Sequence, residues 1–253
     1  MPTKPLVLIT GASSGIGAAT ARKFGKLGYP LALLARRKDR LELLKKELNC
    51  PVSIFEVDVC SQERVAEAIA SIEKDVGPID ILVNNAGGAF GLDVAYESDL
   101  TDWEQCIDVN IKGLLYCTRA VLPSMVKRSC GHIINMGSIA GSYAYPGGNV
   151  YGAAKAFVHH FSLNLRADLL GTQVRVSCIE PGLTGGSEFS AVRFKGDQKK
   201  ANKVYENTNP LLPEDIAEVV YFCTTLPPHA NINTLEIMPT SQASGPLSVY
   251  RTP

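Results

Sequence analysis

The sequence predicts an α/β fold: a doubly wound parallel sheet of about seven strands with helices on both faces. Two observations lead to this prediction. Short aliphatic runs alternate with longer amphipathic segments along the whole chain, which is typical of parallel strands buried under crossover helices. The 253 residues also contain no linker-like stretch, sustained charge run or repeat. We therefore expect a single domain spanning residues 1–253.

In the first half of the chain, each expected strand is a short aliphatic run, and each expected helix has apolar residues three or four positions apart. Gly28 ends the first helix, whereas Gly77 and Pro78 end the third, for which Ser61 is a suitable N-cap. In chain order the elements are strand 5–10, helix 16–27, strand 31–35, helix 39–48, strand 52–57, a helix from about 61 to 77 and strand 79–83.

The second half continues this alternation until a segment without clear periodicity. Glu180-Pro181-Gly182 is expected to break the sixth strand, and the polar residues that follow, at about 183–213, are expected to form a mobile lid. The elements are helix 102–128, strand 132–136, helix 149–170, strand 174–179, helix 214–226 and strand 234–238. Right-handed crossovers then place a ligand crevice beyond the carboxyl ends of the strands.

Charge and composition exclude several classes of protein. Lys plus Arg and Asp plus Glu number 25 each, so no field attracts nucleic acid or an anionic membrane. No apolar run approaches the length of a membrane span, and secretion is not expected either. Seven cysteines without zinc-like spacing indicate buried, free thiols in a reducing cytoplasm. Four histidines form no metal or triad pattern, so no metal is expected: His132, His159, His160 and His229.

A glycine-rich turn, TGASSGIG at residues 10–17, lies between the first strand and the first helix. Gly11, Gly15 and Gly17 have no side chains, so backbone there can approach a pyrophosphate at the helix N-terminus. The spacing is related to the GxGxxG fingerprint without matching it, and a turn without a ligand is the alternative. The turn indicates a nucleotide cofactor.

Arg36 and Arg37 follow the second strand, where no carboxylate is present. An acidic residue there would suit the ribose hydroxyls of NAD, whereas guanidinium groups suit a 2′-phosphate. The pair favours NADP over NAD. The alternative is a solvated basic start to the next helix.

Two further clusters follow the third and fourth strands. Asp58 and Val59 could contact an adenine, or Asp58 could simply cap the next helix. Asn84-Asn85-Ala86-Gly87 could line the same crevice or form an ordinary Asn/Gly turn.

Tyr151 and Lys155 are four residues apart in a predicted helix, with Ser138 in the loop before it. This spacing puts both side chains on one helix face. A phenol has a pKa of about 10, and a neighbouring ammonium favours its phenolate. The pair is therefore suited to proton transfer near neutral pH. The alternatives are a core tyrosine and a loop-capping serine.

Together these motifs resemble the short-chain dehydrogenase/reductase family, classical type, over nearly the whole chain. The resemblance rests on TGASSGIG, NNAG at 84–87, Asn110 in a VN context, Ser138, the YxxxK of Tyr151 and Lys155, and Pro181-Gly182, in this order and spacing. It implies a Rossmann-type fold that binds NADP(H), in a cytoplasmic homotetramer. The cofactor-binding residues would be Gly11, Ser13, Ser14, Gly15, Ile16, Gly17, Arg36, Arg37, Asp58, Val59, Asn85, Ala86, Gly87, Tyr151, Lys155, Pro181, Gly182, Thr184 and Ser187.

The resemblance also implies catalytic roles. Tyr151 would be the general acid or base, and Ser138 would donate a hydrogen bond to the same substrate oxygen. Lys155 would lower the pKa of Tyr151 and bind the nicotinamide ribose. Asn110 would hold a water that links Lys155 to solvent, although a helix irregularity is its structural alternative. Hydride transfer would belong to the nicotinamide.

The segments EPGLTGGSEFSAVRFKGD (180–197) and EIMPTSQ (236–242) resemble a narrower branch, the NADP-dependent 3-hydroxy acid dehydrogenases that also oxidise serine-like substrates. Ser138, Tyr151, Arg193 and Lys195 would then contact the substrate, the two cations pairing with its carboxylate, unless they are surface charges. A sulfoacetaldehyde reductase or a general carbonyl reductase is the alternative enzyme. A protein that binds NADP(H) without turnover is the alternative from another class.

Overall fold

The computed structural model describes residues 4–244. Its sheet has seven strands in the order β3-β2-β1-β4-β5-β6-β7, and all neighbours pair in parallel. The predicted fold class is confirmed. From β1 the chain adds β2 and β3 on one side, and then returns to add β4 to β7 on the other side. The order of strands therefore reverses between β1 and β4, which opens a crevice at their carboxyl ends. The strands are β1 Leu6–Thr10, β2 Leu31–Ala35, β3 Val52–Glu56, β4 Ile79–Asn84, β5 Gly131–Met136, β6 Val174–Pro181 and β7 Thr234–Ile237.

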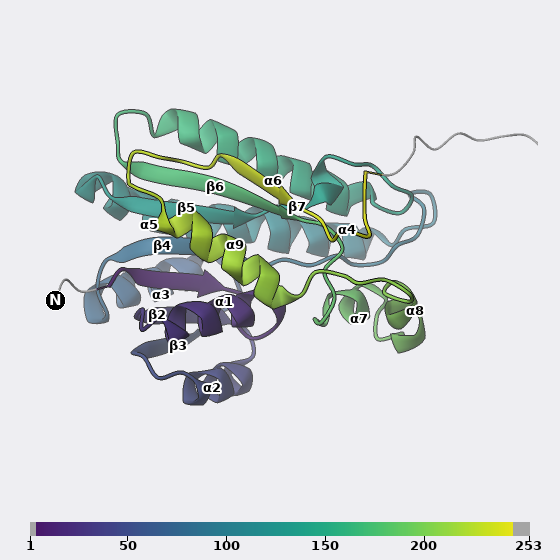
Figure 1. Ribbon diagram of the computed structural model, residues 1–253, viewed down its shortest axis with the longest axis horizontal. Coiled ribbons are helices and arrows are strands. Elements are labelled where there is room, and N and C mark those ends of the chain that lie inside the picture. The colour runs from purple at the N-terminus through teal and green to yellow at the C-terminus, as the bar shows by residue number, and fades with distance from the viewer. Residues whose placement is uncertain (1–3, 245–253) are drawn as a thin grey trace, which may run out of the picture.

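Helices cover both faces of the sheet, α1 and α9 side by side on one and α3 and α5 on the other (Figure 1). Short helices α7 and α8 lie beyond the carboxyl ends of the strands. The helices are α1 Gly15–Lys26, α2 Lys38–Glu47, α3 Gln62–Asp75, α4 Leu100–Ile107, the π-helix η1 Asp108–Lys112, α5 Gly113–Arg128, the 3₁₀ helix η2 Ile139–Gly141, α6 Asn149–Asp168, α7 Phe189–Arg193, α8 Gln198–Lys203 and α9 Pro213–Thr225.

Successive side chains of β1 point to opposite faces of the sheet, so this strand contributes to a separate apolar core on each face. Leu6 and Leu8 pack with residues of α3, α5 and α6. Val7 and Ile9 pack with residues of α1, α2 and α9. Burial of each such side chain contributes roughly 1.5–3 kcal/mol to stability. The two cores hold the strand ends, and hence the loops that follow them, in fixed positions.

Three local features differ from the predicted elements. The helix expected over 102–128 is interrupted by the π-helix around Asn110. The sixth strand continues through Pro181, which pairs with Ile237, because a proline at a strand end removes only one backbone donor. The segment 183–213 contains α7 and α8, whose five and six residues are too few to show a helical period.

Among residues 4–244, no helix has both the length and the apolar character needed to cross a membrane.

Candidate active site

A cavity of about 1280 Å³ opens at the carboxyl ends of the strands. Its walls come from the glycine turn, from the loops after β2 to β6 and from the segment that carries α7. This volume exceeds the roughly 300–1,000 Å³ that is usual for a small-molecule site. The cavity therefore has room for a large cofactor and a small substrate together.

Gly11 and Gly17 of the glycine turn lie so close to the loop after β4 that neither position has room for a side chain. A Cβ on Gly17 would lie 2.5 Å from both Asn85 Nδ2 and the Gly11 carbonyl oxygen. Gly11 and Gly15 have φ angles of +63° and +52°, which favour glycine. The turn thus presents bare backbone at the start of α1, and this cradle fits the pyrophosphate of a dinucleotide.

A hydrogen-bond network fixes the loop after β4 against this turn. Asn85 Nδ2 donates to the carbonyls of Thr10 (2.9 Å) and Gly11 (3.3 Å). In return, Thr10 Oγ1 accepts from the backbone N–H groups of Asn85 and Ala86, at 3.0 Å each. Asn85 therefore supports the turn with its side chain as well as lining the cavity.

Arg37 joins the loop after β2 to the glycine turn. Its guanidinium donates to Ser13 Oγ at 3.2 and 3.3 Å and to Ser14 Oγ at 2.8 Å. Arg36 Nη1 lies 3.8 Å from an Asp58 carboxylate oxygen. Hydroxyl and guanidinium donors gathered at one point are the donor set that a phosphate requires.

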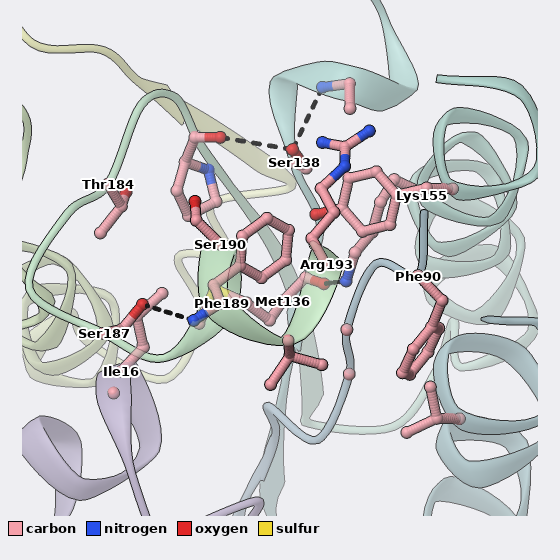
Figure 2. Close-up of a pocket in the computed structure, with 18 of the residues that line it drawn as sticks. Ile16, Phe90, Met136, Ser138, Lys155, Thr184, Ser187, Phe189, Ser190 and Arg193 are labelled. Atoms are coloured by element: carbon pink, nitrogen blue, oxygen red, sulfur yellow. Dashed lines mark hydrogen bonds between the residues drawn. The ribbon is translucent and has the colours of Figure 1, made fainter. Parts of the chain in front are cut away.

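Ser138, Tyr151 and Lys155 all line the cavity at its other end. Lys155 Nζ lies 5.8 Å from the centre of the Tyr151 ring and donates to the Met136 carbonyl at 2.9 Å. Ser138 Oγ accepts from Ala140 N at 3.1 Å and lies 3.5 Å from the Pro181 carbonyl. Figure 2 shows Ser138 and Lys155 near the same space as Phe189 and Arg193.

Burial dominates the pKa of both catalytic candidates. Desolvation raises the pKa of Tyr151 above its ordinary value, while a hydrogen bond with Ser138 and the charge of Arg193 lower it. Lys155 is only 6% exposed, and desolvation lowers its pKa to about 8. Burial therefore keeps the Tyr151 phenol protonated at neutral pH.

Asn110 lies in the π-helix, with its side chain turned toward the loop after β4. Its Nδ2 donates to the carbonyls of Gly88 (2.7 Å) and Cys106 (2.9 Å), and its Oδ1 accepts from Gly88 N. A Cβ on Gly87 would lie 2.7 Å from that oxygen. The π-helix thus aims Asn110 at the loop that lines the cavity.

Arg193, at the end of α7, reaches back over Tyr151. Its guanidinium carbon lies 5.7 Å from the centre of the Tyr151 ring and 5.4 Å from that of Tyr145. It donates to Tyr145 Oη at 3.0 Å and to the Gly91 carbonyl at 3.1 Å. These contacts hold a cation beside the phenol.

Lys195 takes a different direction from Arg193. It is not among the residues that line the large cavity, and its Nζ pairs with Asp102 Oδ2 at 2.9 Å. Other contacts hold the rest of the segment 183–213. Gly185 N donates to the Leu211 carbonyl, and Ser190 Oγ lies 2.7 Å from Tyr205 Oη. Of the two expected cations, only Arg193 is thus placed at the phenol.

Comparison with known proteins identifies the family. The sequence model described as short chain dehydrogenase matches residues 5–197, more than half of the chain. The chain is a short-chain dehydrogenase. This short-chain dehydrogenase is 56% identical to the NADP-dependent 3-hydroxy acid dehydrogenase YdfG of Salmonella typhi over 247 residues, 98% of this chain and 100% of that protein.

Two further relatives are informative. Sulfoacetaldehyde reductase 2 of Chromohalobacter salexigens is 45% identical over 249 residues, 97% of this chain and 98% of that protein. The closed form of a serine dehydrogenase complexed with NADP⁺ has a TM-score of 0.96 and 54% identity, and the match covers 98% of this chain and 100% of that chain. The family resemblance inferred from the sequence is confirmed.

The individual site assignments in this short-chain dehydrogenase stay predictions, but the structure places nearly all of them around one cavity. The exceptions are Gly17, Asn110 and Lys195. Sequence reasoning missed Phe189, Tyr145 and Glu188, which also line it. Only their positions in the segments that follow β5 and β6 could have indicated them, because no local motif connects them with Tyr151.

One group among residues 4–244 has the donor atoms to hold a metal ion. His159, Cys178 and Glu180 place a ligand atom each within 4.8 Å of one another. His159 Nδ1 and Glu180 Oε1 are 2.6 Å apart, so the buried carboxylate already has a partner. Cys178 and Glu180 are two positions apart on β6, whereas His159 comes from α6, and this spacing matches no usual metal motif.

Proposed function

We propose that this protein is an NADP-dependent oxidoreductase that interconverts a small 3-hydroxy acid, serine-like or 3-hydroxypropionate-like, and its semialdehyde or ketone. The observation that carries this proposal is the guanidinium of Arg193 beside the ring of Tyr151, 5.7 Å from its centre. A fixed cation next to the proton-transfer group suits a substrate whose hydroxyl is close to a carboxylate. The names and high identity of the relatives support the same class of reaction.

NADP is the cofactor of this reaction. Ser13, Ser14, Arg36 and Arg37 would hold its 2′-phosphate, and the glycine turn would hold its pyrophosphate. When bound, the nicotinamide accepts a hydride from the hydroxyl-bearing carbon or returns one to the carbonyl carbon. Preference for NADP over NAD follows from the absence of a carboxylate directly after β2.

The protein's own groups move the proton. In reduction the Tyr151 hydroxyl gives its proton to the carbonyl oxygen, and in oxidation the phenolate takes it from the substrate hydroxyl. Ser138 donates a hydrogen bond to the same oxygen. The Lys155 ammonium stabilises the phenolate and, through Asn110 and a water, is resupplied with protons.

The wider organisation is proposed on the same basis. The chain acts as one domain in a cytoplasmic homotetramer, with no nucleic-acid or membrane partner, and residues 183–213 serve as the lid. Equal numbers of acidic and basic residues argue against nucleic-acid and membrane partners, and seven free cysteines support a reducing compartment.

The deciding experiment follows absorbance of the reduced nicotinamide with NADP or NAD and, in turn, L-serine, 3-hydroxypropionate and 3-hydroxybutyrate. Sulfoacetaldehyde with NADPH tests the reverse direction. We expect NADP-linked oxidation of a hydroxy acid that Tyr151→Phe abolishes. Turnover of sulfoacetaldehyde alone would identify a sulfoacetaldehyde reductase, which the relative from Chromohalobacter salexigens favours as the second candidate. NADPH binding without any turnover would indicate a non-catalytic protein.

Arg193→Gln tests recognition of the carboxylate. Losing a charge-assisted hydrogen bond to substrate should raise KM for the hydroxy acid roughly tenfold to a hundredfold, with a smaller change in kcat. An uncharged alcohol of similar size serves as the control substrate, because its KM should not change. Lys195→Gln, measured in parallel, decides whether that residue also contributes. An equal KM increase for both substrates would contradict a role of Arg193 in binding the carboxylate.

A further inference from the structure

An ion-pair cluster connects the cofactor end of the cavity with α7. Glu188, the residue before α7, lies 2.8 Å from Arg37 Nη1 through one carboxylate oxygen and 2.9 Å from Arg40 Nη1 through the other. We call these three residues the Glu188 bridge. Arg40, in the first turn of α2, does not line the large cavity, whereas Glu188 and Arg37 do. One carboxylate thus links two helices that are about 150 positions apart in sequence.

Arg37 is held on both sides by this arrangement. Its Nη1 donates to Glu188, while Nε and Nη2 donate to the hydroxyl oxygens of Ser13 and Ser14. Because both serine oxygens accept these bonds, their hydroxyl hydrogens remain available for an anion. The Glu188 bridge therefore keeps Arg37 and the two hydroxyls in the arrangement that a phosphate group would use.

The same carboxylate fixes the start of a helix that ends at the reacting groups. Phe189, the first residue of α7, has its ring centre 5.7 Å from that of Tyr151. Arg193, its last residue, lies over the same tyrosine. Figure 2 shows Phe189 and Arg193 in the space near Ser138 and Lys155. Glu188 is thus only five residues before Arg193, whose guanidinium faces the Tyr151 phenol.

We propose that Glu188 is a positioning residue that couples occupation of the 2′-phosphate site to the placement of α7, and hence of Arg193, over the substrate. This proposal rests on the proposed function in one respect, the binding of NADP at Arg37. In this role Glu188 touches neither the substrate nor the reacting atoms. It acts through Arg37 and Arg40.

Charge balance explains why an acidic residue belongs beside a phosphate site. Arg36, Arg37 and Arg40 carry three positive charges, and Asp58 and Glu188 carry two negative charges, which leaves one positive charge. A phosphate monoester carries nearly two negative charges at neutral pH. The group therefore keeps an excess positive charge that attracts a 2′-phosphate, while Glu188 limits the repulsion between Arg37 and Arg40 when no phosphate is bound. Arg37 and Arg40 also lower the pKa of Glu188, which keeps it ionised.

The first test uses binding and hydrogen exchange, so it does not depend on turnover. The probes are 2′,5′-ADP, which has the 2′-phosphate, and ADP, which lacks it, each at a saturating concentration set by calorimetry. In the wild type, 2′,5′-ADP should slow amide exchange in residues 187–196 roughly two- to fivefold more than ADP. The effect is small because the three side chains are each about 40% exposed.

Variants separate coupling from simple phosphate binding. In Glu188→Gln, 2′,5′-ADP should still bind, but the extra protection of residues 187–196 should disappear. Arg40→Gln should give the same result and is the second variant if the first does not fold. Glu47→Gln, which removes an exposed ion pair with Arg22 at 2.8 Å, is the matched control and should behave like the wild type. Equal protection by the two probes in the wild type, or persistence of the difference in both bridge variants, would overturn the proposal.

Kinetics provide the second readout. Glu188→Gln should raise KM for the hydroxy acid roughly two- to fivefold with NADP, with little change in kcat, because α7 is less well placed while Tyr151 is untouched. This difference in KM between the variant and the wild type should be smaller in about 1 M salt, because the salt screens the ion pairs of Glu188 in the wild type as well. A loss of kcat at unchanged KM would also contradict the proposal. Absence of turnover in the wild type would overturn the proposed function, while the exchange experiment would still decide on the coupling.

Discussion

At the scale of single residues, the site depends on an ammonium that is almost removed from water. Lys155 is 6% exposed, and its described hydrogen bond goes to the Met136 carbonyl. Among residues 4–244, no carboxylate offsets this loss of hydration, so the pKa of Lys155 falls to about 8. The protein therefore keeps a poorly solvated cation beside Tyr151 at a cost in stability, which is common at functional sites.

Lys155→Met measures that cost. Between a folded pKa of about 8 and an unfolded value of 10.5, the unfolded chain binds more protons, so wild-type stability rises with pH in this window. Below pH 8 the full cost remains, and we expect the variant to be roughly 2–3 kcal/mol more stable at pH 7, after loss of the bond to Met136. The difference should shrink toward pH 10, and activity should vanish.

Urea unfolding of the cofactor-free protein at pH 7 and pH 10 checks this prediction. Lys45→Met, at an exposed position of α2, is the control, and its stability difference from the wild type should not vary with pH in this way. If Lys155→Met were instead less stable than the wild type by an amount that does not vary with pH, the fold would already offset the lost hydration of the Lys155 ammonium.

At the scale of elements, the glycine turn and the loop after β4 form one unit. Gly17 has no room for a side chain, since a Cβ there would lie 2.5 Å from the Asn85 amide nitrogen of that loop and 2.5 Å from the Gly11 carbonyl oxygen of the turn. In Gly17→Ala, either the turn or the Asn85 loop must move. Overpacking of this kind costs about 1–3 kcal/mol, and we expect NADP affinity to fall at least roughly tenfold.

Gly25→Ala is the matched control within the same helix. Its Cβ would lie 2.7 Å from Leu48 Cδ2, a flexible side-chain end far from the cradle. Calorimetry should find unchanged NADP affinity in this variant and weakened affinity in Gly17→Ala. Similar affinities in both would mean that the close approach of Gly17 to Asn85 does not shape the cofactor site.

The elements also show how far the sequence alone could lead. Strands and long helices were predictable because their periodicity reflects burial on the two faces of the sheet. At Asn110 the sequence offered a helix irregularity as an alternative but did not predict the π-helix itself, because one extra residue within a single turn shifts the helical pattern over too short a stretch to be recognised. Asn110, Tyr151 and the glycine turn were predictable through family motifs. The ion pairs of Glu188 were not, because its partners lie about 150 positions away and only the fold brings them together.

At the scale of the whole molecule, the cavity is lined by segments from Gly11 to Ser244 and therefore depends on both halves of the sheet. Each half contributes to the same two apolar cores. A ligand that fills the cavity should consequently stabilise the chain as one unit, whereas two independent domains would respond separately.

Thermal unfolding with and without cofactor tests this unity. At an NADP concentration one hundred times its Kd, binding adds about 2.7 kcal/mol to the free energy of unfolding. For a chain of this size, that should raise the midpoint of a single transition by roughly 5–10 °C. NAD at the same concentration should raise the midpoint much less, because it has no 2′-phosphate for Arg36 and Arg37 to bind. Arg37→Gln should reduce the difference in midpoint between the two cofactors. Two transitions, of which only one responds to NADP, would contradict the single domain, and equal shifts with NAD would contradict selection of the 2′-phosphate.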